Sequence, residues 1–283
     1  MSSDQVICFG EILWDCLPRG LFLGGAPLNV ACHLAQMGFD ARLVSAVGND
    51  FLGGEALRRI QTHGVLTDRI FQHPTLPTGV VIAELDSDGN AHYEFAQPVA
   101  WDEIRIKDDP AVLMSSARAI VFGSLALRSK SNLRALQTIL EEDGPLKCFD
   151  INLRPPFDDL DLVRKLARTV DLLKLNETEL ARLVDVSPTS DRFIVADRCE
   201  MFAAQSGVRQ ICVTLGADGA LFWQPDDLHF APAPKVNVRD TVGAGDAFMA
   251  TLVAGLAIGQ PIPDVLAEAC AHGAKVAAQD GAI

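Results

Sequence analysis

The chain has 283 residues, with 24 lysines and arginines against 37 aspartates and glutamates, so its formal net charge is −13. An acidic chain without a run of basic residues repels the phosphate backbone, which excludes nucleic acid as an expected partner. Apolar residues make up 49% of the sequence, enough to fill a sizeable core. The composition therefore predicts one large α/β domain or two ordinary ones.

Three features of the sequence bear on location. The start, Met1-Ser2-Ser3-Asp4, lacks the basic and apolar parts of a signal peptide. The longest apolar run, 247–259, is shorter than the roughly 20 residues that a bilayer-spanning helix needs. The seven cysteines include no Cys-x-x-Cys pair, which is typical of buried free thiols in a reducing compartment. We expect a cytoplasmic protein with no membrane contact.

Short apolar runs alternate with longer helical patterns along the chain. The expected strands are 6–10, 41–47, 119–122, 148–150, 172–175 and 210–214. The expected helices include 26–37, 54–63, 131–142 and a last apolar one that begins at 247. This alternation predicts a largely parallel sheet with helices on both faces.

One segment departs from that alternation. Residues 78–85 and 91–96 have strand character, and the Asp-Ser-Asp-Gly-Asn sequence between them is typical of a turn. The hairpin is either an addition to the edge of the main sheet or a lid that projects over a site.

The strongest local pattern is Asp-Thr-Val-Gly-Ala-Gly-Asp at 240–246, directly before the last apolar helix. Small residues at Gly243, Ala244 and Gly245 let backbone N–H groups converge at a helix N-terminus, which favours an anion. Asp246 would then stand beside that anion. A glycine turn followed by an ordinary acid at the helix start is the alternative.

A second glycine cluster, Gly24-Gly25-Ala26-Pro27-Leu28-Asn29, leads into the helix expected at 26–37. Asp15 and Asn29 offer an acceptor and a mixed donor and acceptor to a polyhydroxylated ligand. Asp150, Asn152 and Arg154 follow a strand, where ligands gather in open α/β sheets. The alternatives are a turn with a helix cap in the first case and a surface ion pair between Asp150 and Arg154 in the second.

Two further clusters allow both a structural and a functional interpretation. Asn176 with Glu179 fits a capping box, which glutamine at 179 would also satisfy, but Glu179 also suits a hydrated magnesium ion. Thr214-x-Gly216-x-x-Gly219 is either a hairpin turn or a backbone that approaches a nucleotide. The phosphate-loop motif and the dinucleotide-binding glycine motif are both absent.

The order of these clusters resembles the ribokinase/PfkB family of sugar kinases over nearly the whole chain. The segments that carry the resemblance are 24–31, 34–38, 47–53, Asn176-x-x-Glu179, Thr214-x-Gly216-x-x-Gly219 and 240–248. It implies a ribokinase-like three-layer α/β sandwich with a mostly parallel central sheet. It also implies one domain over 1–283, with lid strands around 11–23 and 78–100, and allows a homodimer formed through the lid.

The resemblance also implies a role for each matching residue. Asp246 would be the catalytic base, and Gly243, Ala244 and Gly245 the anion hole for the transferred phosphoryl group. The remaining positions are Asp15, Gly24, Gly25, Asn29 and Arg154 for the sugar, Asn176, Thr214, Gly216 and Gly219 for the nucleotide, Glu179 for magnesium through water, and Asp240 for potassium. ATP and Mg²⁺, and in some members K⁺, are the implied cofactors.

The identity of the sugar rests on fewer residues. The segment 149–155 resembles fructokinases and also 2-keto-3-deoxygluconate kinases, which often carry Tyr-Arg on a lid strand. Here Glu94 follows Tyr93, and an acid disfavours a substrate carboxylate. We therefore expect a neutral ketohexose such as fructose, with the keto acid, a nucleoside or a sugar phosphate as alternatives.

Two proteins of other classes also have to be considered. A catalytically silent binding protein on the same fold predicts loss of the base or of the anion hole, and both sequence patterns are present. A dinucleotide-dependent oxidoreductase requires the glycine motif that the chain lacks. Kinase activity is therefore the expected function.

Overall fold

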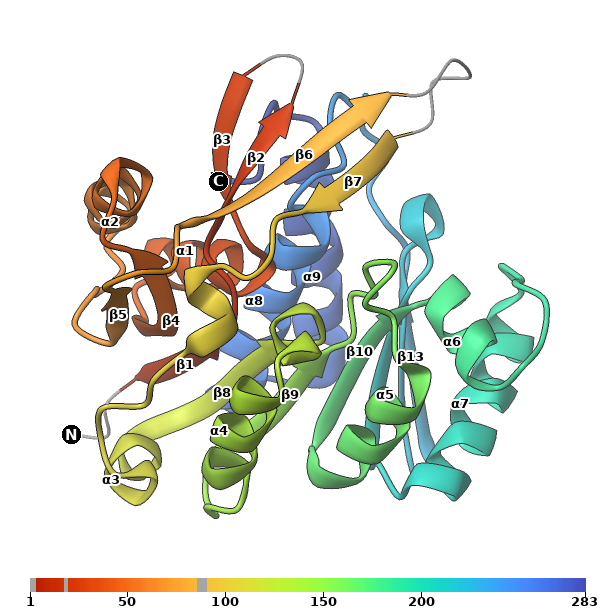
Figure 1. Cartoon of the computed structure of the whole chain (residues 1–283). Helices are drawn as coiled ribbons and strands as arrows, with labels where there is room; N and C mark the ends of the chain where they lie inside the picture. Colours follow the sequence, from red (N-terminus) through yellow and green to blue (C-terminus); the bar gives the residue numbers. More distant parts are fainter. Residues whose placement is uncertain (1–3, 18–19, 86–90) are drawn as a thin grey trace.

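The computed structural model describes residues 4–17, 20–85 and 91–283 (Figure 1). A nine-stranded sheet forms the centre of this part of the chain. Its strands are β1 (Gln5–Phe9), β4 (Asp40–Gly48), β5 (Ile70–His73), β8 (Ala117–Gly123), β9 (Leu146–Asp150), β10 (Leu172–Asn176), β11 (Gln210–Thr214), β12 (Ala220–Gln224) and β13 (Asp227–Ala231).

The strand order across this sheet is β13-β12-β11-β10-β9-β8-β1-β4-β5. The neighbours from β5 to β11 pair in parallel, whereas β12 pairs antiparallel with both β11 and β13. Parallel strands need crossover connections, and helices supply most of them here. The carboxyl ends of the parallel strands therefore lie along one edge of the sheet.

The helices cover both faces of the sheet, as Figure 1 shows. They are α1 (Ala26–Gln36), α2 (Phe51–Thr62), α3 (Pro110–Ser115), α4 (Lys130–Leu140), α5 (Leu160–Leu166), α6 (Glu177–Leu183), α7 (Arg192–Ser206), α8 (Ala244–Ala257) and α9 (Ile262–Ala277). Short 3-10 turns occupy Ala100–Glu103, Leu125–Arg128, Ala167–Thr169 and Gly216–Asp218.

Alternating strand residues divide the interior into two cores. In β1, Val6 and Cys8 join one apolar cluster with residues of α1, α8 and α9. Ile7 and Phe9 of the same strand face the other cluster, which α3 to α7 complete. Side chains of a strand point alternately to the two faces of a sheet, and both faces are covered here. The result is the three-layer sandwich that the family resemblance implied.

A separate four-stranded sheet stands beside the carboxyl edge of the large one. It consists of β2 (Leu13–Leu17), β3 (Gly20–Gly24), β6 (Gly79–Leu85) and β7 (Ala91–Phe95), in the order β3-β2-β6-β7. The predicted hairpin strands at 78–96 thus join a small second sheet rather than an edge of the main one (Figure 1). The turn residues 86–90 lie outside the described residues.

The predicted strands and helices are all found, with differences at their ends. The largest are at α8, which begins at Ala244 rather than at 247, and at α2, which begins at Phe51 rather than at Gly54. Asp50 explains the difference at α2, because its carboxylate accepts a hydrogen bond from Gly53 N at 2.8 Å and so caps the helix start. Six of the seven cysteines are buried and all seven are free, whereas Cys16 is exposed.

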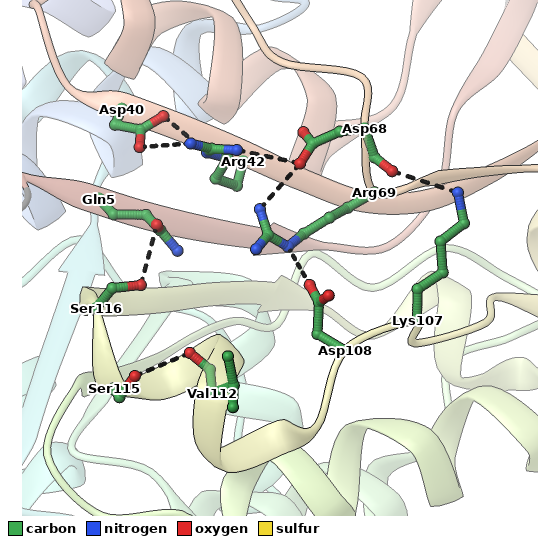
Figure 2. Close-up of polar contacts among 10 residues, drawn as sticks. All are labelled: Gln5, Asp40, Arg42, Asp68, Arg69, Lys107, Asp108, Val112, Ser115 and Ser116. Carbon is green, nitrogen blue, oxygen red and sulfur yellow. Dashed lines mark hydrogen bonds and ion pairs between the residues drawn. The ribbon is translucent and has the colours of Figure 1, made fainter.

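Figure 2 shows polar contacts near the amino-terminal ends of the strands. Arg42 of β4 contacts Asp68 at 3.1 Å, and Arg69 contacts Asp108 at 2.7 Å. These pairs connect β4 to the loops before β5 and α3. Exposed ion pairs of this kind contribute about 0–1 kcal/mol each. The amino edge is thus held by surface pairs, while the carboxyl edge carries a different set of polar groups.

No helix within the described residues is long and apolar enough to cross a bilayer.

Candidate active site

Strand register brings the polar residues of the carboxyl edge together. Asp150 at the end of β9 is the direct partner of Lys174 in β10, and Asn176 is the partner of Thr214 in β11. Asp150 and Lys174 have the same strand parity as Cys148 and Leu172, which belong to the core beneath α8. The two charged side chains therefore point to the face that α8 covers.

Helix α8 begins in the glycine-rich segment, with Gly243 as its N-cap residue in the left-handed region at φ +80°. The N–H of Asp246 donates to Gly243 O at 3.0 Å, and that of Ala244 donates to Thr241 O at 3.3 Å. The sequence places no large side chain at 243–245, so the backbone at this helix start is accessible to an anion. The predicted helix and its glycine-rich start are thus present, with the acid in the first turn.

Asp246 is held from the side by helix α1. Its Oδ2 accepts a hydrogen bond of 2.7 Å from Asn29 Nδ2, and both side chains are buried. Gly25 precedes α1 at φ +120°, and a Cβ at this position would lie 2.4 Å from Glu11 O. Only glycine fits there. In the second glycine cluster, the backbone at Gly25 therefore packs closely against the backbone at Glu11, and this packing directs Asn29 toward Asp246.

A small cavity of about 250 Å³ lies next to this hydrogen bond. Among its lining residues are Asp15, Gly24 and Asn29, which were predicted to bind the acceptor, and Val242 of the glycine-rich loop. Gly24 touches Asp15 closely, since a Cβ at 24 would lie 2.4 Å from Asp15 Oδ2. The cavity thus joins the small sheet to the starts of α1 and α8.

Lys174 and Asp150 form a buried ion pair beside the start of α8. Lys174 Nζ lies 3.0 Å from Asp150 Oδ1 and 2.9 Å from Oδ2. A Cβ at Gly245 would lie 3.3 Å from the same ammonium nitrogen. The surface pair between Asp150 and Arg154 considered from the sequence is wrong, because strand register gives Asp150 a buried partner. Asp150 and Arg154 nevertheless both act electrostatically on Asp246.

The Asn176 and Glu179 pair forms the predicted capping box at the start of α6. Asn176 Oδ1 accepts from Glu179 N at 2.9 Å, and Glu179 Oε2 accepts from Asn176 N at 2.8 Å. The other carboxylate oxygen, Oε1, accepts from Leu153 N at 2.8 Å. Glu179 therefore ties α6 to the loop that follows β9, a connection that the capping pattern alone does not reveal.

A larger cavity of about 550 Å³ lies at the start of α6. Its lining includes five of the residues predicted for the nucleotide, the metal or the phosphate: Arg154, Asn176, Glu179, Thr214 and Gly216. Gly219 lies outside it. A Cβ at Gly219 would lie 2.0 Å from Ala231 O, so that glycine closes the β11–β12 turn against β13.

Burial raises the pKa of several acids in this region. It raises the pKa of Asp246 to about 6, with the Asp150 carboxylate acting in the same direction and the Asn29 hydrogen bond, Lys174 and Arg154 opposing. Burial also raises the pKa of Asp15 to about 6, although Arg154 acts to lower it. Acids with raised pKa values that share a cleft are typical of catalytic sites.

Lys174 remains a cation despite its burial. Desolvation acts to lower its pKa, but the Asp150 carboxylate, Glu179 and Asp246 outweigh it, so the pKa is raised. Burial raises the pKa of Glu179 as well. The region between the two cavities thus combines the cations Lys174 and Arg154 with several carboxylates.

Two buried charged residues of this region were not predicted from the sequence. Lys174 is the only charged residue of β10, and a lone lysine in an apolar strand is a signal that would have identified it. Glu11 is 3% exposed, and its Oε1 accepts from Ala26 N at 3.2 Å. Its position directly after the buried strand β1 is the corresponding signal.

Comparisons with known proteins show what the whole chain is similar to. The profile of the pfkB family carbohydrate kinases matches residues 10–283. A fructokinase from Escherichia coli is 30% identical over 268 residues, which cover 90% of this chain and 85% of the relative. The structure of a Vibrio cholerae fructokinase bound to fructose, ADP and calcium has a TM-score of 0.84 at 26% identity, covering 100% of this chain and 95% of that one. A 2-dehydro-3-deoxygluconokinase from Thermotoga maritima shares the fold, with a TM-score of 0.87 at 24% identity over 98% and 95% of the two chains.

Proposed function

Because this chain belongs to the pfkB family of carbohydrate kinases, we propose that it transfers the γ-phosphoryl group of ATP to a neutral ketohexose such as fructose. The observation that carries the proposal is Asp246, a buried carboxylate in the first turn of α8 that Asn29 holds and that borders the Lys174 pair. The cavity of about 250 Å³ would take the sugar, and that of about 550 Å³ the nucleotide.

In the proposed reaction, Asp246 accepts the proton of the sugar hydroxyl. The oxygen then forms a bond to the γ-phosphorus, while the bond from that phosphorus to the β–γ bridging oxygen breaks and ADP leaves with the electron pair. The products are the sugar phosphate, ADP and a protonated Asp246. A positioned general base typically contributes about 10²–10⁴-fold to such a step.

The N–H groups of 243–245 and the Lys174 ammonium would hold the charge of the transferred group. Ala244 N donates to Thr241 O over 3.3 Å, a weak bond that an incoming phosphoryl oxygen can replace. Gly245 has no side chain between this loop and Lys174 Nζ. Positioning and electrostatic stabilisation are what phosphoryl transfer mainly requires.

The residues present fit magnesium through water rather than by direct ligation. Both oxygens of Glu179 already accept backbone hydrogen bonds, and the described residues contain no cluster of three or more His, Cys, Asp or Glu for a metal. Each carboxylate oxygen keeps a second lone pair for a water of a hydrated ion. Bound Mg²⁺ would neutralise charge on the ATP phosphates.

Potassium at Asp240 and a homodimer through the small sheet complete the proposal. Asp240 lies beside the α9 end, since its N–H donates to Ala277 O at 3.3 Å, so a cation near its carboxylate would adjoin the glycine-rich loop. Leu21 and Ile82 are each 41% exposed and both pair with Cys16 in the small sheet, which supports an apolar contact surface there. Light scattering and activity in K⁺-free buffer test these two points.

A 2-keto-3-deoxygluconate kinase is the second candidate. Arg154 acts to lower the pKa of Asp15 and of Asp246, so this cation lies near the acceptor side and suits a carboxylate. Against it, Glu94 of β7 is exposed, pairs with Ile82 and adds negative charge to the small sheet, while the side chain of Tyr93 lies outside the described residues. We therefore prefer the neutral sugar.

A coupled assay of ADP release tests the proposal with fructose, ribose, 2-keto-3-deoxygluconate, tagatose 6-phosphate and adenosine as acceptors. We expect the highest kcat/KM with fructose. A keto-acid efficiency more than about tenfold above that of fructose would overturn the choice of sugar. Failure of every acceptor, with intact ATP binding, would instead favour a silent binding protein.

A further inference from the structure

Glu11 is a buried carboxylate that the proposed reaction does not use. The residue is 3% exposed, and its Oε1 accepts from Ala26 N at 3.2 Å. Its Oε2 is also buried, and no hydrogen-bond partner for it is found among the described residues. A buried carboxylate with one unsatisfied oxygen is costly, which argues that the side chain has a role beyond filling space.

Glu11 contacts the start of α1 through both its side chain and its backbone. Ala26 is the first residue of α1, and its N–H donates the hydrogen bond to Glu11 Oε1. Gly25 presses against the Glu11 carbonyl, because a Cβ at 25 would lie 2.4 Å from that oxygen. The first turn of α1 is then closed by the bond from Asn29 N to Gly25 O at 2.9 Å. Glu11 therefore fixes the turn that carries Asn29.

Asn29 connects the first turn of α1 to Asp246. Its Nδ2 donates to Asp246 Oδ2 at 2.7 Å, while its own Oδ1 is buried without a described partner. The Asn29 side chain thus has one strong bond that determines its direction. A shift of the first α1 turn would lengthen that bond, since the described residues offer the side chain no second hydrogen bond.

On the premise that Asp246 is the base, we propose that Glu11 is a positioning residue. It holds the first turn of α1 so that Asn29 stays bonded to one oxygen of Asp246 and leaves the other for the acceptor hydroxyl. Glu11 itself does not touch the reacting atoms.

The direction in which the pKa of Asp246 changes in Glu11 variants distinguishes this role from a simple charge effect. The Asn29 bond lowers that pKa, so loosening Asn29 raises it. Burial raises the pKa of Glu11 to about 7, so this group is largely protonated near pH 6 and its removal takes away little repulsion. Any remaining charge effect would act in the opposite direction, because an ionised Glu11 repels the Asp246 carboxylate. The other charges near Asp246 are Asp150, Lys174, Arg154 and Asp15, and they stay in place in every variant used below.

The decisive measurement is the pKa of Asp246 in the ligand-free protein, followed by NMR of a ¹³C-labelled aspartate carboxyl group that Asp246→Asn identifies. We expect Glu11→Ala and Asn29→Ala each to raise it, and the double variant to raise it no further than Asn29→Ala alone. Glu11→Gln keeps an acceptor for Ala26 N, so its value should equal or fall below that of the wild type. A Glu11→Ala value at or below wild type, an additive double variant, or a raised value in Glu11→Gln would overturn the proposal.

Kinetics give an independent readout. Glu11→Ala should lower kcat at least about tenfold at a KM for ATP within about twofold of wild type, and Glu11→Gln should restore it. Asp109→Ala is the matched control, because it removes a carboxylate that caps the remote helix α3 by accepting from Ala111 N. It should leave both kcat and the Asp246 pKa unchanged. A loss of kcat in this control as large as that in Glu11→Ala would contradict the proposal.

Glu11→Asp covers the case in which Glu11→Ala does not fold. The shorter side chain keeps the charge but no longer reaches Ala26 N, so the Asp246 pKa should rise and kcat should fall. Wild-type values of both in this variant would contradict the role of Glu11. High activity of Asp246→Asn would contradict the proposed base, not the role of Glu11. The NMR measurement would still test whether Glu11 and Asn29 affect the pKa of Asp246.

Discussion

Asp246 combines a long-range hydrogen bond with burial at a helix start. Its partner Asn29 lies 217 positions away in the sequence, and the carboxylate is 8% exposed. The first turn of a helix stabilises a negative charge, whereas burial destabilises it. Burial is the stronger effect here and raises the pKa to about 6. The carboxylate is thus still ionised at neutral pH but binds a proton more readily than an exposed aspartate.

Asp246→Asn should lower kcat by at least about 10²-fold and leave the fold and ATP binding intact, because the amide is nearly isosteric but cannot take a proton. The wild-type rate should also fall as the pH drops through about 6, where Asp246 becomes protonated. Steady-state kinetics between pH 5 and 9 and calorimetric titration with ATP check both statements. Turnover of the variant within a few-fold of wild type would mean that Asp246 is not the base.

The same substitution should stabilise the protein at neutral pH. Because the folded pKa of Asp246 is raised from 3.8 to about 6, the folded state binds the proton more tightly, and stability is lost as the pH rises through that window. A rise of about two pKa units corresponds to about 3 kcal/mol at pH 8. Thermal melts should therefore show a higher Tm for Asp246→Asn at pH 8 and a vanishing difference below pH 4. A lower Tm of the variant at pH 8 would contradict this account.

At the scale of single elements, Glu179 makes one more hydrogen bond than its capping box requires. One carboxylate oxygen accepts from Asn176 N within α6, and the other accepts from Leu153 N in the loop after β9. Glutamine has only one side-chain oxygen. The capping box alone would accept glutamine, but in this geometry an NH₂ group would face a backbone N–H, so we expect glutamine to be destabilising.

Glu179→Gln should lower the free energy of unfolding by about 1–3 kcal/mol, the cost of an unsatisfied buried group. If Glu179 also orients a hydrated Mg²⁺, the variant should need more Mg²⁺ for half-maximal rate. Denaturant melts and Mg²⁺ titrations of the rate separate the two effects. Glu200→Gln on the exposed side of α7 is the control. Unchanged Mg²⁺ dependence alongside reduced stability would restrict Glu179 to a structural role.

The start of α1 allows a paired test of backbone constraint. Gly25→Ala introduces a Cβ that would lie 2.4 Å from Glu11 O at φ +120°, so stability should fall by at least about 1–3 kcal/mol and kcat should drop with it. Gly54→Ala in α2 meets no atom within 4 Å and should be neutral or stabilise by up to about 1 kcal/mol. Chemical denaturation of both variants measures the contrast. Equal stabilities would show that the contact at Gly25 does not constrain the helix start.

At the scale of the whole molecule, the site lies where the small sheet meets the carboxyl edge of the large one. We propose that residues 1–283 act as one domain in which the small sheet serves as the lid. The acceptor cavity belongs partly to the small sheet, and the nucleotide cavity belongs to the large one. Arg154 lines the second cavity and acts electrostatically on Asp15 of the first, so it is the residue most suited to report which substrate binds.

Arg154→Ala tests the class of substrate. If Arg154 serves the transferred phosphate, kcat should fall for every acceptor, whereas pairing with a substrate carboxylate predicts a raised KM for the keto acid alone. We expect the first result. Because Arg154 lowers the pKa of Asp246, the acidic limb of the rate profile should also move to higher pH. Kinetics with fructose and 2-keto-3-deoxygluconate measure these effects, and a change confined to KM for the keto acid would refute our assignment.

The sequence by itself determined the local features of this protein. Apolar periodicity located six strands of the nine-stranded sheet, the two hairpin strands and four of the helices, and the spacing of Asn176 and Glu179 predicted the capping box. The glycine-rich segments were recognisable because a helix start against a close backbone needs residues without side chains. The order of these segments was enough to indicate the family that the profile match shows.

Only the tertiary structure decided which distant groups meet. Asp150 pairs with Lys174 because β9 and β10 are in parallel register, and Asn29 reaches Asp246 because α1 and α8 lie side by side on one face of the sheet. The position of Glu11 after a buried strand hints at burial, but nothing local indicates that Ala26 N will be its partner. Burial, which sets the pKa values of these acids, depends on every packed layer around them. It therefore cannot be derived from the short segments that carry them.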